Sequence, residues 1–385
     1  MGIVTCKPER EADRQTRRID TQIRMESQVN KKRVKVLLLG VSDSGKSTIV
    51  KQMRVNYMDG FNETEVVNAI FVIRNNIIDA FRSIANIIIH SDIIVSKEEK
   101  VLITLFAHES SKIEMMQEVD ELNVINSVRT YKCIQEFFER FAFHPLVPDH
   151  IHYFFPNLER IAVTNYTPTK EDLIHMRQTT LGVHEISFDM TSHTIRLIDV
   201  GGQKTERRKW IHFFEGVTAV MFVCSLASFN QTSEEESKSI VWESSSNKVQ
   251  NKTLVRASGK AKVDKPGLVN RLDESVDLFK SVRENSFLSM SNFMLFLNKK
   301  DLLVKKLEMF QFKDFFPEYK NWINSDNSMS SVAEYIESMF REGLQSKHRI
   351  YSHLTEATDH TNIDYTFVLC CSVIFEKNID EMKLE

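Results

Sequence analysis

Short apolar runs alternate with stretches of helical spacing along most of the chain. The runs at 34–39, 219–226 and 293–297 are continuous, as in strands that helices cover on both faces. Three further strands are expected at 185–190, 194–199 and 350–354. Helical spacing follows the first run at 49–55 and returns from about residue 362 to the end. This order predicts an α/β domain with a mostly parallel six-stranded sheet flanked by helices.

A long region from about residue 61 to 143 has helical spacing throughout. Apolar residues such as Val66, Ile70, Ile77 and Phe81 recur at intervals of three to four. Prolines at 145, 148, 156 and 168 close the region. Such stripes are typical of a helix-bundle core. We therefore expect an inserted all-α domain at 59–170, which interrupts an α/β domain formed by residues 34–58 and 171–385.

Two polar segments lie outside these domains. Residues 1–33 are expected to form a helical arm. From residue 7 onward this segment is highly charged and lacks glycine, so it cannot bury itself in a core. It is either a solvated arm or a surface that binds a partner or anionic lipid. The stretch 234–269 is rich in Ser, Lys and Glu and poor in large apolar residues, which predicts a disordered surface insertion. A gene-model error is the alternative reading of this stretch.

Composition narrows the class of protein. The 385 residues are 42% hydrophobic and 27% charged, as in a soluble globular protein. The net charge of −3 argues against nucleic acid as the main partner. Five cysteines without metal spacing or a secreted framework indicate a reduced, intracellular protein. There is no apolar run of about 18 residues, which a membrane span requires.

The strand at 34–39 leads directly into the sequence GVSDSGKST, residues 40–48, and then into a helix. Strand, glycine loop and helix start are the context in which the pattern G-x-x-x-x-G-K-[ST] predicts a phosphate loop. Backbone N–H groups and the helix N-terminus would hold the phosphates. Lys46 would reach the outer phosphates and Ser47 would ligate Mg²⁺. The stretch therefore predicts a nucleoside triphosphate site; a chance glycine turn is the alternative.

Two later stretches suit the same chemistry. Asp199 ends a strand and is followed by two glycines and Gln203. The Asp199 carboxylate can bind Mg²⁺ through water, and the Gly202 N–H can donate to a terminal phosphate oxygen. Gln203 can then orient the attacking water. Asn298-Lys299-Lys300-Asp301 follows another strand. The Asp301 carboxylate can accept both the ring N–H and the exocyclic amine of guanine, a donor pair that adenine does not offer. The nucleotide predicted is therefore a guanine nucleotide.

These stretches resemble the α subunits of heterotrimeric G proteins, and the resemblance covers nearly the whole chain. It is carried by GVSDSGKST (40–48), DLIHMRQTTLGV (172–183), DVGGQKTERRKW (199–210), FLNKKD (296–301) and TEAT (355–358). The resemblance implies a P-loop GTPase domain with an inserted helical domain, a GTP- and Mg²⁺-dependent signalling switch, and slow hydrolysis of GTP to GDP.

The resemblance also assigns roles to residues. Arg177 falls on the arginine finger and Gln203 on the water-orienting glutamine, while Ser47 and Thr180 fall on the Mg²⁺ ligands; this division of labour is the one described for the Gα class in general. The residues implied to contact the nucleotide are Gly40, Asp43, Ser44, Gly45, Lys46, Ser47, Thr48, Ile174, His175, Arg177, Thr180, Asp199, Gly202, Gln203, Asn298, Lys299, Asp301 and Ala357.

Partners and location are implied in the same way. The arm and the second switch, 202–210, would meet a G-protein βγ dimer, and the C-terminal helix would meet a seven-helix receptor; the effector is open. The first residues nearly match a myristoylation pattern at Gly2, and Cys6 is a candidate palmitoyl acceptor. Two acyl chains would hold the protein on the inner face of the plasma membrane. An ordinary N-terminus is the alternative.

The chain departs from the family's pattern at several positions. Ser42 and Asp43 stand where the family loop usually has glycine and glutamate. A side chain at Ser42 would point toward the space shared by Gln203 and Arg177, and misplacing either by about 1 Å costs on the order of 100-fold in rate. Glu356 stands where a small neutral residue is usual, which could raise the off-rate of GDP. Met382 replaces a cysteine that some members modify.

Three functions are compatible with these motifs. The first is a slow GTPase that acts as a timed switch. The second is a GTP-dependent binding module in which Ser42 makes hydrolysis negligible. The third, an ATPase, is opposed by Asp301 and by the TEAT segment.

Overall fold

The computed structural model describes residues 33–107, 118–190, 193–232, 269–343 and 350–383. Gly2 and Cys6, the predicted acylation sites, lie outside the described residues. So do nearly all of the predicted arm and insertion, which stay predictions. Within the part of the chain that is described, no helix has the length and apolar character required to cross a membrane.

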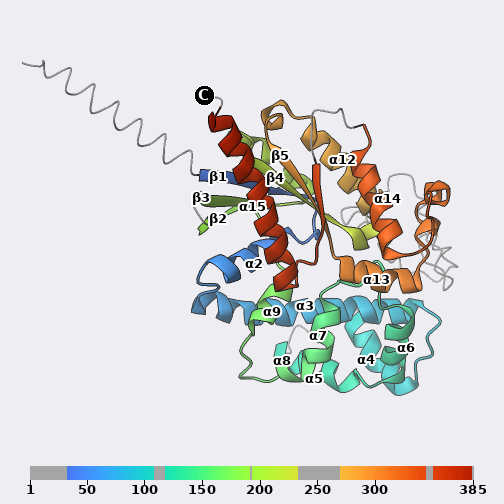
Figure 1. Ribbon diagram of the computed structural model, residues 1–385. Coiled ribbons are helices and arrows are strands. Elements are labelled where there is room, and N and C mark those ends of the chain that lie inside the picture. The colour runs from blue at the N-terminus through green and yellow to red at the C-terminus, as the bar shows by residue number, and fades with distance from the viewer. Residues whose placement is uncertain (1–32, 108–117, 191–192, 233–268, 344–349, 384–385) are drawn as a thin grey trace, which may run out of the picture.

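A single sheet of six strands forms the centre of the larger body, in the order β2-β3-β1-β4-β5-β6 (Figure 1). Neighbouring strands are parallel except for β2, which runs antiparallel to β3. The six-stranded, mostly parallel sheet expected from the sequence is therefore confirmed. The strands are β1 (Arg33–Leu39), β2 (Val183–Met190), β3 (His193–Val200), β4 (Ala219–Ser225), β5 (Asn292–Asn298) and β6 (Ile350–Leu354).

The two faces of the sheet are covered by different helices. Alternate residues of β1 enter different clusters: Val36 packs with α2 and α15, whereas Leu37 packs on the opposite face with α12, α13 and α14. Burial on both faces explains why the strands read as continuous apolar runs. These helices are α2 (Lys46–Tyr57), α12 (Arg271–Arg283), α13 (Lys300–Met309), α14 (Met329–Arg341) and α15 (His360–Lys383).

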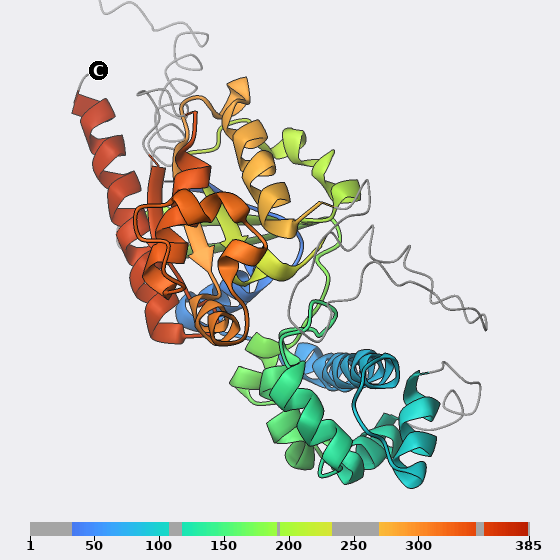
Figure 2. The same ribbon diagram turned by 90° about the vertical axis from the view of Figure 1, so that its right-hand side faces the viewer.

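A second body of helices lies beside the sheet domain (Figure 2). Its core is a separate cluster of buried side chains that runs from Ala69 to Leu173 in sequence. The long helix α3 begins with a capping box, in which Asn62 accepts from the Glu65 N–H and Glu65 accepts from the Asn62 N–H. The helices are α3 (Glu63–His90), α4 (Lys97–Ala107), α5 (Glu118–Val128), α6 (Lys132–Arg140), α7 (Ile151–Phe154), α8 (Leu158–Ile161) and α9 (Lys170–His175).

Several boundaries differ from the sequence-based expectation. Helical structure is not continuous from 61 to 143, because α3 ends at His90 and α4 begins only at Lys97. Helix α2 starts at Lys46, directly after Gly45 in the left-handed region. Spacing alone predicted neither α12 nor α14. The remaining short elements are α10 (Lys204–Arg207) and the 3-10 turns η1 (Phe155–Asn157), η2 (Trp210–Phe213), η3 (Leu226–Asn230), η4 (Ser286–Leu288), η5 (Phe312–Asp314) and η6 (Pro317–Asn321).

Candidate functional site

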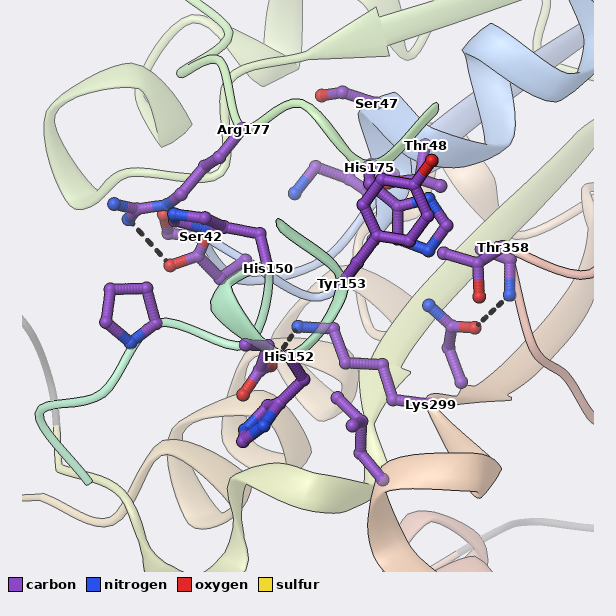
Figure 3. Close-up of a pocket in the computed structure, with 18 of the residues that line it drawn as sticks. Ser42, Ser47, Thr48, His150, His152, Tyr153, His175, Arg177, Lys299 and Thr358 are labelled. Atoms are coloured by element: carbon purple, nitrogen blue, oxygen red, sulfur yellow. Dashed lines mark hydrogen bonds and ion pairs between the residues drawn. The ribbon is translucent and has the colours of Figure 1, made fainter. Parts of the chain in front are cut away.

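A cavity of about 640 Å³ opens at the carboxyl ends of the parallel strands, where sheet domain and helical body meet. This is the edge at which open α/β sheets bind ligands, and the volume suits a small molecule. Figure 3 shows Arg177 on one side of the cavity and Thr358 on the other. The sequence-predicted residues that line it are Asp43, Gly45, Lys46, Ser47, Thr48, Ile174, His175, Arg177, Thr180, Gly202, Gln203, Asn298, Lys299, Asp301 and Ala357.

Three predicted residues lie behind this lining. Gly40 has φ +144°, and a Cβ there would stand 2.2 Å from the Val223 carbonyl oxygen. The left-handed backbone and this close approach both require glycine. Ser44 is fully buried, and its carbonyl accepts from Asn298 Nδ2 at 2.8 Å. Asp199 is 2% exposed. These three residues therefore support the residues that line the cavity and do not line it themselves.

Lys46 folds back over the loop that precedes it. Its Nζ donates to the carbonyls of Gly40 at 2.9 Å and Val41 at 2.8 Å. Burial lowers the pKa of Lys46 to about 8, while the nearby Asp199 carboxylate acts in the opposite sense. A Cβ on Gly202 would lie 2.5 Å from this Nζ. The ammonium thus lies within the loop, with glycine backbone close on the other side.

Oxygen atoms from three separate segments meet beside the start of α2. Ser47 Oγ and Thr180 Oγ1 lie 2.6 Å apart, and both donate to Asp199 Oδ2, at 3.2 and 3.3 Å. The other carboxylate oxygen, Asp199 Oδ1, is buried without a hydrogen-bond partner. Burial raises the pKa of Asp199, against the opposing effect of Lys46. Hydroxyl and carboxylate oxygens with one unsatisfied buried acceptor fit a hard cation such as Mg²⁺.

A ligand set made only of histidine, cysteine and acidic side chains is absent from the described residues. A Mg²⁺ site of the phosphate-loop type uses other donors, since hydroxyls and phosphate oxygens supply most of its coordination. Ser47, Thr180 and Asp199 are therefore the residues that fit the ion.

Arg177 is held in a two-pronged ion pair with Asp43. Its Nε and Nη2 lie 2.9 and 2.8 Å from the two carboxylate oxygens. Arg271 approaches the same carboxylate at 3.9 Å and also donates to the Ser42 carbonyl. Burial alone would raise the pKa of Asp43, but Arg177 and Arg271 outweigh it and hold that pKa well below its usual range. The guanidinium of Arg177 is thus bound to the carboxylate of Asp43 in the loop at 40–48.

Asn298 joins the phosphate loop to the segment at 355–358. Besides its bond to Ser44, its Oδ1 accepts from the Ala357 N–H at 2.9 Å and from Thr355 Oγ1 at 3.3 Å. The Ala357 carbonyl accepts from Gln52 Nε2 at 3.1 Å. Asp301 lines the cavity next to this segment. Asn298 therefore connects the segment at 355–358 to the loop at 40–48.

Two charged residues at this end modify the site. Lys299 has a left-handed backbone, φ 63°, and its Nζ donates to Asp149 Oδ2 of the helical body at 2.7 Å. Glu356 lines the cavity near Asp301. Burial, with the negative charge of Asp301 as the next cause, raises the pKa of Glu356. Two carboxylates, those of Asp301 and Glu356, thus lie at this end of the cavity.

Some residues that contact the predicted site residues, or the segment beside them, had no sequence signal. Arg271 and Asp149 lie far in sequence from the residues they contact, as do Lys51 and Asn76, whose hydrogen bonds reach the segment just before and at Arg177. No motif or spacing in the sequence singles out any of these four positions. Tertiary packing brings these residues to the site: Arg271 within the sheet domain, and Asp149 and Asn76 across the junction with the helical body.

Comparisons with known proteins agree with this geometry. A family model described as "G-protein alpha subunit" matches residues 13–374. The chain is 77% identical to the "Guanine nucleotide-binding protein alpha-5 subunit" of Caenorhabditis elegans over 385 residues, covering all of both chains. It is 70% identical to the protein with the same description in Caenorhabditis briggsae, again over the full lengths. The "Guanine nucleotide-binding protein alpha-2 subunit" of Schizosaccharomyces pombe is 34% identical over 94% of each chain.

Proposed function

Because this chain belongs to the family of G-protein α subunits, we propose that the cavity is its guanine-nucleotide site and that Ser42 and Asp43 slow its turnover. Members of the family bind GTP or GDP with Mg²⁺, hydrolyse GTP and signal as the α subunits of heterotrimeric G proteins. The observation that carries the assignment of the cavity is the meeting of Ser47, Thr180 and Asp199 beside the phosphate loop.

In this proposal the phosphates lie between the backbone of the loop and Lys46. Ser47 and Thr180 hold Mg²⁺, with Asp199 acting through its water shell; the ion supplies neutralisation of phosphate charge. Gln203, at the N-terminus of α10, orients the attacking water. Asp301 accepts the guanine donors, and Asn298 keeps the base segment aligned with the loop.

Hydrolysis is the slow step of this proposed cycle. Arg177 acts on the transferring phosphoryl group only after its guanidinium leaves Asp43, and the pair is bidentate at 2.8–2.9 Å. Its side chain is 40% exposed, so the pair is screened and weaker than a buried one. Ser42 precedes this carboxylate and lines the same cavity. The proposed result is a protein that binds GTP normally and hydrolyses it slowly. In the impaired extreme, where hydrolysis is slow enough to be negligible, the protein acts as a GTP-dependent binding module.

The finer contacts of the cycle are part of the same proposal. The GDP-bound chain pairs with a βγ dimer through the arm and residues 202–210, and the C-terminal helix α15 meets a seven-helix receptor. Acylation at Gly2 and Cys6 holds the protein on the inner face of the plasma membrane. The effector is not identified by any of these residues.

Tryptophan fluorescence tests the proposed site. Trp210 is buried at the end of the predicted second switch, 202–210, and its Nε1 donates to the Gly201 carbonyl at 2.9 Å. Addition of Mg²⁺ and a non-hydrolysable GTP analogue to GDP-bound protein is expected to change its emission, because the γ-phosphate orders this segment. A response to the analogue without one to GDP plus aluminium fluoride indicates the impaired extreme. No response to either ligand would overturn the assignment.

A further inference from the structure

The backbone just before Arg177 is held from two sides. Lys51 Nζ donates to the Met176 carbonyl oxygen at 2.6 Å. Asn76 Oδ1 accepts from the Arg177 N–H at 2.7 Å. This carbonyl and this N–H belong to the same peptide unit, so both of its polar groups are bound by side chains.

The two side chains come from different bodies of the protein. Lys51 lies on α2, the helix that follows the phosphate loop, and Asn76 lies on α3 of the helical body. In a trans peptide the C=O and N–H groups point in opposite directions, and the described chain has no cis bond. The peptide plane is therefore fixed between α2 and α3, and its orientation depends on both helices.

The residues that hold the peptide are themselves constrained. The backbone carbonyl of Asn76 is also hydrogen-bonded to His150 Nε2 at 3.1 Å, which ties this turn of α3 to the residue just before α7. The ammonium of Lys51 lies among pocket-lining residues, where burial lowers its pKa to about 7. Directing that group at one carbonyl compensates part of its lost hydration. The Lys51 bond is partly buried and the Asn76 bond is exposed, but both join segments more than 100 residues apart in sequence.

We propose that Lys51 and Asn76 are positioning residues for GTP hydrolysis, which act by fixing the peptide plane from which the Arg177 side chain departs. The inference rests on the proposed role of Arg177. With the plane fixed, only side-chain rotation separates the Asp43-bound guanidinium from a phosphoryl group. With either bond removed, the backbone of Arg177 also becomes variable, and a displacement of about 1 Å costs on the order of 100-fold in rate.

Single-turnover hydrolysis of preloaded GTP, measured in the full-length Ser42→Gly chain, tests the proposal. Asn76→Leu and Lys51→Met each remove one bond while keeping the size of the side chain. Each is expected to slow hydrolysis by about 10- to 100-fold, with affinity for a non-hydrolysable GTP analogue within about threefold of the parent. Lys51→Arg, which keeps a donor, is expected to restore most of the rate.

The matched control is Asn75→Leu. Asn75 is the neighbour of Asn76 on α3, and its side chain donates to the Phe71 carbonyl of the same helix at 3.1 Å. It is expected to hydrolyse GTP at the parent rate. Equal slowing by Asn75→Leu and Asn76→Leu would overturn the proposal, because the effect would then reflect helix stability.

Combination with Arg177→Ala separates positioning from general destabilisation. If Asn76 acts through Arg177, the double variant is no slower than Arg177→Ala alone, because coupled residues are not additive. Full additivity, or unchanged rates in Asn76→Leu and Lys51→Met beside a slow Arg177→Ala, would overturn the positioning role alone. Unchanged hydrolysis in Arg177→Ala, or none in the Ser42→Gly parent, would overturn the proposed function and with it this inference.

Discussion

Replacement of Asp172 by asparagine is expected to destabilise the protein strongly. The Asp172 carboxylate is fully buried at the start of α9, the short helix that leads to Arg177. Five hydrogen bonds converge on it. The donors are Tyr153 Oη (2.9 Å), Tyr166 Oη (2.8 Å), Arg160 Nη1 and Nη2 (2.7 and 2.8 Å) and the Thr169 N–H (2.8 Å).

The magnitude follows from this geometry. Three of the donors face Oδ2 and two face Oδ1, so an asparagine amide in either orientation leaves at least two donors opposite its own N–H groups. Each buried donor left unsatisfied costs about 1–3 kcal/mol. Arg160 is 40% exposed and can regain water, so its share is small. The expected loss in the free energy of unfolding is about 3 kcal/mol.

Urea denaturation at a fixed, saturating GDP concentration measures this loss. The expected shift of the midpoint is about 1 M toward lower urea. Tyr166→Phe removes one of the five bonds and no charge, so it is expected to cost only about 1 kcal/mol. A loss for Asp172→Asn no greater than that for Tyr166→Phe would refute the reasoning, since the carboxylate would then be replaceable by any acceptor.

Three further outcomes are expected. Asp301→Asn should weaken GTP binding by about 100-fold in a fluorescent-analogue titration, because the guanine donors lose their acceptor; an unchanged affinity would exclude Asp301 from base recognition. Glu356→Ala should slow GDP release several-fold in a stopped-flow chase, since it removes a second carboxylate near the base. Between pH 7 and 5 the free energy of unfolding should fall by about 4 kcal/mol, or about 2 kcal/mol for each of two histidines, because burial lowers the pKa of His144 and His152 to about 4, whereas unfolded histidine titrates near 6.5, so the folded state binds fewer protons in this window. Protonation of His144 also opposes the bond that its Nδ1 accepts from the Leu146 N–H at 3.2 Å, and a pH-independent urea midpoint in that window would contradict the assignment.

The sheet was predictable because its signal is local. The continuous apolar runs of β1, β4 and β5 reflect burial on both faces, which each strand shows in its own residues. The phosphate loop and the stretch at 298–301 could also be predicted from the sequence, because these motifs require glycine and particular polar residues at fixed spacing. These features do not depend on what the rest of the chain does.

The contacts that join the two bodies could not be predicted in this way. Lys299 contacts Asp149, and Arg177 is bonded to both Asp43 and Asn76, at sequence separations of 101 to 150 residues. The spacing of apolar residues along the chain reports only local structure and carries no information about contacts between residues so far apart in sequence. Helices α12 and α14 are a different case, because each carries a readable signal that the sequence-based prediction did not use: Leu272, Val276 and Phe279 in α12, and Val332, Ile336 and Phe340 in α14, recur at helical spacing on one face.

Ser42 and Asp43 are the positions on which the account of slow turnover depends. Ser42→Gly is expected to accelerate single-turnover hydrolysis of GTP by about 10- to 100-fold, because the serine is proposed to displace Arg177 or Gln203 by up to about 1 Å. Rapid mixing of GTP-loaded protein with Mg²⁺, followed by measurement of released phosphate, gives the two rates directly. Faster release from the Ser42→Gly chain is the predicted result, and equal rates for the two chains would contradict it.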